Sequence, residues 1–144
     1  MCAYFKNLSM KKNILLVEDD ELDVKSINKT LKNLKVDYDL HVVNNGVDAI
    51  VKLTSNVGSS KFLPDIILLD INMPRMNGIE FLTIIKNYYR FKNIKIFILA
   101  NSIEEYDKLS LQNLGVYGCI LKPMDFKKKS SRYAIELLND ILEN

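Results

Sequence analysis

Five charged residues of this sequence stand where short apolar runs end: Glu18, Asp19, Asp20, Asp70 and Lys122. Carboxylates that gather in one place repel each other, so together they need a cation. Oxygen ligands without a nearby cysteine or histidine select a hard ion such as Mg²⁺. A lysine beside such an ion can neutralise a phosphate oxygen as a point charge. These residue types therefore indicate phosphoryl chemistry, provided that the fold brings them together.

Asp70 is the member of this group that can itself react. An aspartate can accept a phosphoryl group as an acyl phosphate, and phosphoryl transfer mostly needs positioning and charge neutralisation. A simpler interpretation is that the acids cap helices and interact with helix dipoles. That interpretation accounts for one or two acids at 18–20 but less well for three. The sequence therefore holds the parts of a protein that is phosphorylated on Asp70.

Five apolar runs predict the strands that position these side chains: residues 13–17, 38–43, 66–69, 94–99 and 118–121. The run Ile66-Ile-Leu-Leu69 is bounded by turn residues, as is typical of a strand buried on both faces of a parallel sheet. Alternating strands and helices predict right-handed βαβ units with helices on both faces. Ligands of such sheets bind at the carboxyl ends of the strands, where Asp70 would lie.

Helical spacing fills the stretches between these runs. Val24, Ile27, Leu31 and Leu34 form one apolar stripe, and further helices are predicted over 47–54, 78–89, 102–113 and 127–142. For the helix after the fourth strand, Ser102 is the expected N-cap and Glu105 completes a capping box. Gly115 is expected to stop that helix.

Length and composition indicate one domain. The chain has 144 residues, of which 48% are hydrophobic, and its net charge is +2. Residues 1–9 lack a clear period and are expected to be a poorly ordered extension, with the domain over 10–144 and Met10 as a second possible start.

Neither the charge nor the lysines at 127–129 indicate nucleic-acid binding, and no apolar run approaches membrane-spanning length. Two isolated cysteines and no secretory segment make the cytoplasm the expected compartment.

Three motifs together resemble the receiver domain of two-component response regulators. They are Leu-Val-Glu-Asp-Asp at 16–20, Leu-Leu-Asp-Ile-Asn-Met-Pro-Arg-Met-Asn-Gly at 68–78 and Leu-Lys-Pro at 121–123. The resemblance covers about residues 12–142 and is to single-domain, chemotaxis-regulator-like members. It implies an α/β, flavodoxin-like (βα)5 fold, with a five-stranded parallel sheet in the order 2-1-3-4-5.

The resemblance also implies roles for the residues that match the family's motifs. Asp70 matches the phosphoacceptor, and Lys122 matches the lysine that contacts the phosphoryl group. Asp19 matches the direct Mg²⁺ ligand, and Glu18 its acidic neighbour, which often acts through water. Asn72 matches the position whose backbone carbonyl binds the metal.

Three more positions concern the family's switch and its structure. Pro123 matches a structural proline that usually follows a cis bond. Ala100 stands where the family has Ser or Thr, and Cys119 where it prefers an aromatic residue. In the family, the hydroxyl moves towards the phosphoryl group and the ring turns inward behind it. We therefore expect phosphorylation with a weakened switch, in which Asn101 or Ser102 could supply a substitute contact.

The resemblance predicts a stand-alone response regulator rather than an enzyme. Its partners would be a sensor histidine kinase or phosphotransfer protein and an unknown downstream protein, with no nucleic acid or membrane, and it would be a monomer or homodimer. The loop at 55–63 looks like that of single-domain regulators, including some paired with phytochrome-type kinases.

Two alternative functions follow from the same residues. Ala100 and Cys119 favour a pseudo-receiver, a binding module that signals without a phosphorylation cycle, whereas the intact acids and Lys122 oppose it. An aspartyl-phosphate hydrolase would use the same nucleophile, but such enzymes carry a second Asp at the position of Asn72.

Overall fold

A computed structural model of the chain describes residues 11–34, 36–55, 62–125 and 129–143. The predicted extension at 1–9 lies outside the described residues. So do most of the predicted loop at 55–63 and the first two residues of the last predicted helix. None of the described helices is long and apolar enough to span a membrane.

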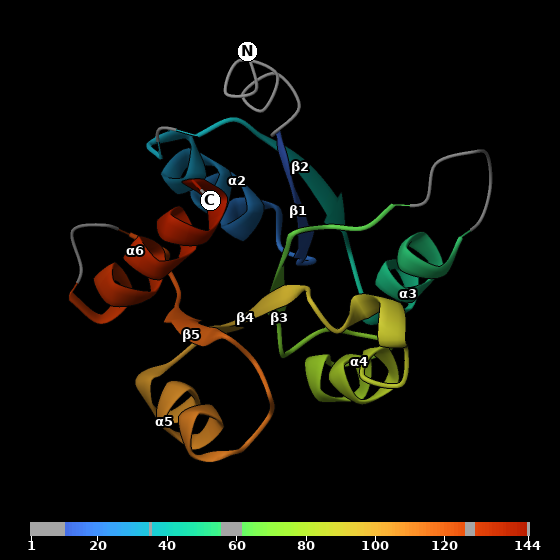
Figure 1. Ribbon diagram of the computed structural model, residues 1–144. Helices are drawn as coiled ribbons and strands as arrows, with labels where there is room; N and C mark the ends of the chain where they lie inside the picture. Colours follow the sequence, from blue (N-terminus) through green and yellow to red (C-terminus); the bar gives the residue numbers. More distant parts are fainter. Residues whose placement is uncertain (1–10, 35, 56–61, 126–128, 144) are drawn as a thin grey trace, which may run out of the picture.

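The centre of the fold is a sheet of five parallel strands (Figure 1). They are β1 (Lys12–Val17), β2 (Tyr38–Val43), β3 (Ile66–Asp70), β4 (Lys95–Ala100) and β5 (Gly118–Leu121). Their order is β2-β1-β3-β4-β5, and every neighbouring pair is parallel. This confirms the predicted flavodoxin-like α/β fold and its strand order.

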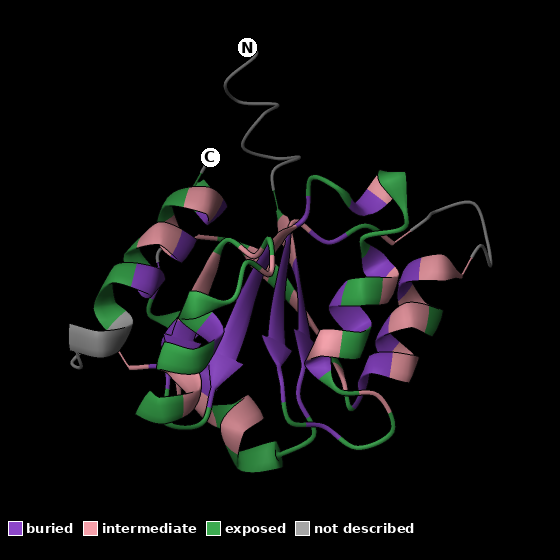
Figure 2. Ribbon diagram, turned by 90° about the horizontal axis from the view of Figure 1, so that it is seen from below, coloured by how far each residue is buried: buried purple, intermediate pink, exposed green. Residues whose placement is uncertain are grey.

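Helices cover both faces of the sheet. They are α2 (Glu21–Lys32), α3 (Gly46–Thr54), α4 (Gly78–Ile85), α5 (Ile103–Leu111) and α6 (Lys129–Glu143). Ile66 and Leu68 of β3 pack in the core cluster that includes α2 and α6, whereas Ile67 and Leu69 pack in the cluster that includes α3 and α4. Figure 1 shows these two helix pairs on opposite sides of the sheet. Burial on both faces explains why the central strands are continuous apolar runs (Figure 2).

Two predicted helices end earlier than expected. The helix predicted over 78–89 ends at Ile85. A short 3₁₀ helix, Tyr89–Phe91, follows it and buries the Phe91 side chain. The helix predicted over 102–113 ends at Leu111, because Gln112 adopts an extended backbone. Gly115 does not end the helix itself: its positive φ of 69° lies in the turn that leads to β5.

The parallel arrangement gathers the ends of four strands at one edge of the sheet. In Figure 2 the strand arrowheads point to the same edge. β1 delivers Glu18 and Asp19 there, β3 delivers Asp70, β4 ends at Ala100, and β5 leads into Lys122. Apart from Cys119, which lies within β5, the predicted site residues therefore belong to this edge or to the loops directly after it.

Candidate functional site

Three carboxylates meet at this edge of the sheet. Ligand oxygens of Glu18, Asp19 and Asp70 lie within 4.8 Å of one another. The Glu18 and Asp70 residues are 1% and 3% exposed, whereas Asp19 faces solvent. A set of oxygen donors with one open side fits a hard divalent cation. The structure thus brings together the three acids predicted as metal ligands.

Lys122 reaches into this group from the end of β5. Its Nζ donates to Glu18 Oε1 at 2.7 Å and to Asp23 Oδ2 at 2.9 Å, and lies 3.5 Å from Asp70 Oδ2. The Lys122 backbone is fixed because its N–H donates to the Ala100 carbonyl at 2.8 Å, and the Lys122–Pro123 peptide bond is cis.

Asp23 is a member of this charge cluster that sequence reasoning missed. It lies in the first turn of α2, where an acid is readily explained as a partner of the helix dipole. The available signal was its position one turn after the acids that end β1, which places it over the same edge of the sheet.

Burial and mutual contact shift the pKa values of Glu18 and Lys122. The pKa of Glu18 is raised to about 7, mainly by desolvation and also by the nearby Asp70, against the opposing effect of Lys122. For Lys122, burial favours a lower pKa, but the hydrogen bonds to Glu18 and Asp23 outweigh it and raise the pKa. One lysine charge faces several carboxylates, so the site attracts a further cation.

The loop after β3 holds Asp70 from the other side. The Asn72 N–H donates to Asp70 Oδ1 at 3.1 Å, which leaves Oδ2 facing Lys122. The loop folds back tightly, because the Gly78 N–H donates to the Ile71 carbonyl at 3.0 Å. A Cβ at Gly78 would lie 2.6 Å from Ile71 Cδ1 and 2.9 Å from Ile71 Cα, so only glycine fits there.

The β4–α5 side of the site differs from the predicted capping box. Ser102 Oγ accepts from the Glu105 N–H at 3.1 Å, as expected of an N-cap. The Glu105 carboxylate, however, accepts from the Asn101 N–H at 3.0 Å and from Asn72 Nδ2 at 2.5 Å. The predicted return of Glu105 to the Ser102 N–H is therefore wrong, because the Asn72 amide of the neighbouring loop is within its reach.

The two positions that depart from the family's pattern, Ala100 and Cys119, lie in the neighbouring strands β4 and β5. Ala100 is fully buried and apolar. Cys119 is half-buried beside a hollow of about 280 Å³, whose other lining residues include Tyr106 and Gly118. Burial raises the pKa of the Cys119 thiol to about 11, and the Glu105 charge adds to the shift, so this thiol stays protonated at neutral pH.

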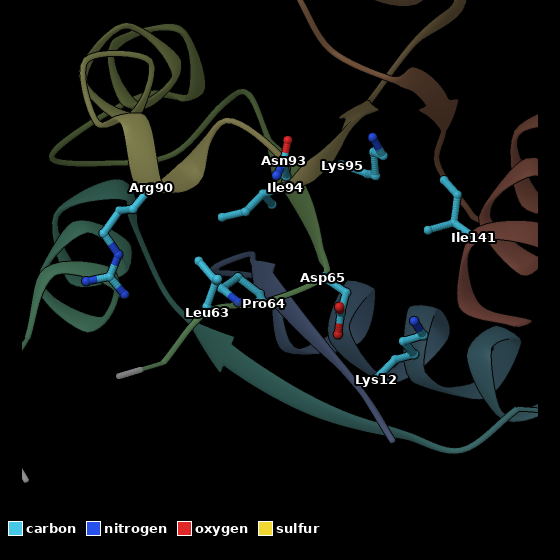
Figure 3. A pocket seen from close by; sticks show the side chains of 9 residues that line it. All are labelled: Lys12, Leu63, Pro64, Asp65, Arg90, Asn93, Ile94, Lys95 and Ile141. Carbon is cyan, nitrogen blue, oxygen red and sulfur yellow. The ribbon is translucent and has the colours of Figure 1, made fainter. Parts of the chain in front are cut away.

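A second hollow, of about 250 Å³, lies at the opposite edge of the sheet (Figure 3). Its lining includes Lys12 and Lys95, the first residues of β1 and β4, and Asp65, which precedes β3. Asp65 Oδ2 already accepts from the Asn13 N–H at 2.9 Å. Because parallel strands place their two ends at opposite edges, this hollow is separate from the carboxylate site.

The family model described as the response regulator receiver domain matches residues 14–133. Response regulator Rcp1 of Synechocystis sp. is 32% identical over 117 residues, which cover 81% of this chain and 80% of Rcp1. The CpxR homologue of Haemophilus influenzae, a transcriptional regulatory protein, is 30% identical over 118 residues. That match covers 82% of this chain but 47% of the homologue, so the chain spans about half of that relative.

Solved structures show the same likeness. A two-component response regulator from Legionella pneumophila has a TM-score of 0.74 and 32% identity, with 93% of this chain and all of that chain covered. The bacteriophytochrome response regulator RtBRR has a TM-score of 0.77 and 30% identity, covering 90% and 78%. The Mn²⁺-bound form of Rcp1 has a TM-score of 0.66 and 29% identity, covering 92% and 90%.

Proposed function

The chain belongs to the response regulator receiver domain family of two-component systems, and from this premise we propose that it accepts a phosphoryl group on Asp70 in phosphorelay signalling. Receiver domains are signalling modules, and this chain would act as the acceptor of a kinase rather than as an enzyme in its own right. The observation that carries the proposal is the meeting of Asp70 with Lys122 and two further acids at the strand ends.

The geometry supports transfer to the Asp70 carboxylate. One of its oxygens would form a bond to phosphorus while the P–N bond of a phosphohistidine donor breaks. The bonding electrons return to the imidazole nitrogen, which then takes up a proton. Lys122, 3.5 Å from Asp70 Oδ2, would neutralise charge on the phosphoryl oxygens, and the Asn72 N–H orients the carboxylate.

We propose Mg²⁺ as the metal, held by Asp19, Asp70 and the Asn72 carbonyl, with Glu18 acting through water. The oxygen-only donor set fits this ion, and the solved Rcp1 structure named above is an Mn²⁺-bound form. When bound, the ion would offset negative charge on the phosphoryl oxygens.

Asp19→Asn tests this assignment in a Mg²⁺ titration. Because it removes a charged ligand, it should weaken Mg²⁺ binding by at least about tenfold. Asp20→Asn is the matched control: Asp20 caps α2 by accepting from the Leu22 and Asp23 N–H groups, and Asn caps a helix equally well. Equal Mg²⁺ affinity in the parent and in Asp19→Asn would remove Asp19 from the metal site.

The proposed donor is a sensor histidine kinase or a phosphotransfer protein, and the output is contact with a downstream protein. The likeness to the bacteriophytochrome response regulator RtBRR makes a phytochrome-type kinase the first donor to test. Phosphorelays of this kind draw on ATP, so we place the protein in the cytoplasm.

Intact-mass measurement tests the function. The protein is incubated with acetyl phosphate and either Mg²⁺ or EDTA. We expect a gain of one phosphoryl group with Mg²⁺ and none with EDTA. No gain under either condition, in a protein that binds Mg²⁺ and is folded, would reject phosphorylation and favour a pseudo-receiver.

A further inference from the structure

The Glu105 carboxylate links α5 to the acceptor residue through two hydrogen bonds. Glu105 Oε2 accepts from Asn72 Nδ2 at 2.5 Å, and the Asn72 backbone N–H donates to Asp70 Oδ1 at 3.1 Å. Glu105 Oε1 accepts from the Asn101 N–H at 3.0 Å, at the end of β4. A half-buried carboxylate thus spans the two loops that flank Asp70.

This use of Glu105 differs from ordinary helix capping. At the start of α4, Glu80 returns to the N–H of its own N-cap, Asn77, in a complete capping box. Glu105 occupies the same N3 position of α5 but engages groups outside its own cap. Its contacts are therefore not explained by helix capping alone.

A phosphoryl group on Asp70 would compete with Glu105. It carries close to two negative charges and three strong acceptor oxygens. The like charge repels the Glu105 carboxylate, and the new oxygens are better partners for the Asn101 N–H. Ala100 offers no hydroxyl that could take part instead. The group that the phosphoryl group would displace at this site is therefore the carboxylate of Glu105.

We propose that Glu105 is the positioning residue that couples Asp70 to α5: its carboxylate holds the start of α5 against the site until the phosphoryl group displaces it. This inference rests on the proposed phosphorylation of Asp70. A ligand shifts a conformation only through contacts that differ between two states, and the Glu105 hydrogen bonds are such contacts. Glu105 thus supplies a contact that is lost on phosphorylation, whereas a hydroxyl at position 100 would gain one.

The next residue, Tyr106, lies beside a hollow into which its ring can move when Glu105 is displaced. Tyr106 is half-buried, packs against the core cluster that includes α3 and α4, and lines the hollow of about 280 Å³ beside Cys119. Because Cys119 is small, the space next to it can admit an aromatic ring. Release of Glu105 frees the first turn of α5 and lets the Tyr106 ring shift within this hollow.

Labelling kinetics test the charge of Glu105. Glu105→Gln keeps an acceptor oxygen but removes the charge that an anionic donor must approach. The initial rate of labelling by acetyl phosphate, measured by intact mass, should rise about threefold. Glu104→Gln is the matched control, since it makes the same charge change at the exposed neighbouring residue of α5 and should leave the rate unchanged.

Amide chemical shifts test the coupling itself. Glu105→Ala, without phosphoryl mimic, should move the amides of Asn101 and α5 towards the positions that beryllofluoride produces in the parent. Glu80→Ala breaks the complete capping box on α4 and controls for loss of a cap. It should leave the α5 amides in place.

The outcomes separate the inference from the proposed function. If the parent is labelled but Glu105→Gln matches Glu104→Gln, or if Glu105→Ala moves the α5 amides in directions unrelated to beryllofluoride, Glu105 is only a helix residue and the inference is overturned. If the folded parent is neither labelled nor shifted by beryllofluoride, the proposed function fails, and the inference fails with it.

Discussion

The two halves of the site are built in opposite ways. Glu18, Asp70 and Lys122 come from strand ends, are nearly closed to solvent and hold one another directly. Asn72, Asn101 and Glu105 come from loops and a helix start, and are exposed or half-buried. The first group is positioned by the sheet, whereas the second is positioned by hydrogen bonds that another acceptor can replace.

The free energies of the interactions in the two halves of the site also differ. Removing one member of a buried charge pair costs about 3–5 kcal/mol, because the other charge stays buried without a partner. An exposed hydrogen bond contributes about 0.5–1.5 kcal/mol, which one new anion can outweigh. The buried half is therefore suited to chemistry that needs fixed charges, and the exposed half to a response.

The largest expected effect is at Asp70. Asp70→Asn should abolish labelling by acetyl phosphate, because an amide oxygen is a far weaker nucleophile than a carboxylate. The fold should persist, since the amide is nearly isosteric and removes one of several clustered negative charges. Asp107→Asn, at an exposed position of α5, should label like the parent. Label that persists in Asp70→Asn would place the acceptor elsewhere.

Lys122→Met should destabilise the fold more than any change in the exposed half. It leaves Glu18 and Asp70 without their shared cation, so the free energy of unfolding in urea should fall by about 3 kcal/mol. Lys25→Met, on the exposed surface of α2, should change it by less than about 0.5 kcal/mol. A loss at Lys122 no larger than at Lys25 would show that the buried half is not held by this lysine.

Stability without metal should fall as pH rises from about 4.5 to about 7. The Glu18 pKa is raised from 4.5 to about 7, so the folded protein binds this proton more tightly than the unfolded chain does across that range. In EDTA, the free energy of unfolding of the parent should fall by about 2 kcal/mol more than that of Glu18→Gln over this range.

Burial lowers the pKa of His41 below its ordinary value, so its contribution to the pH dependence has the opposite sign. His41 is present in both proteins and cancels in the comparison. Parallel pH profiles of the parent and Glu18→Gln would contradict the raised pKa of Glu18.

The smallest effect concerns the extent of the response. In the parent, beryllofluoride should shift mainly the first turn of α5, because the usual switch side chains are absent. Ala100→Thr with Cys119→Tyr should extend the shifts over the face formed by α5, β5 and α6, with the new ring using the hollow beside position 119. Large shifts across this face in the parent, unchanged in the double variant, would show that another device transmits the signal.

The buried half of the site could be predicted from sequence far better than the exposed half. A continuous apolar run such as Ile66–Leu69 specifies a central strand, and parallel topology then places Asp70 and Lys122 at one edge. The charged residues at the ends of three strands, β1, β3 and β5, were enough to predict the site. The strand order itself came from the family resemblance.

The contacts of Asp23 and Glu105 depend on distances that no local pattern encodes. Lys122 reaches Asp23 across 99 positions of sequence, and Asn72 reaches Glu105 across 33. Ser102 and Glu105 match a capping box in sequence, but the neighbouring loop offers the carboxylate another partner. Local rules also misjudged the ends of α4 and α5, where burial of Phe91 and the turn into β5 decide the boundary.

The most direct test of the account is the position of the phosphoryl group. Protein labelled by acetyl phosphate in Mg²⁺ is reduced with borohydride, which converts an aspartyl phosphate to homoserine, and its peptides are sequenced by mass spectrometry. We expect homoserine at residue 70 alone, in the peptide that contains β3. Homoserine at Asp19, or its glutamate-derived counterpart at Glu18, with Asp70 intact, would contradict the assignment of Asp70 as the acceptor.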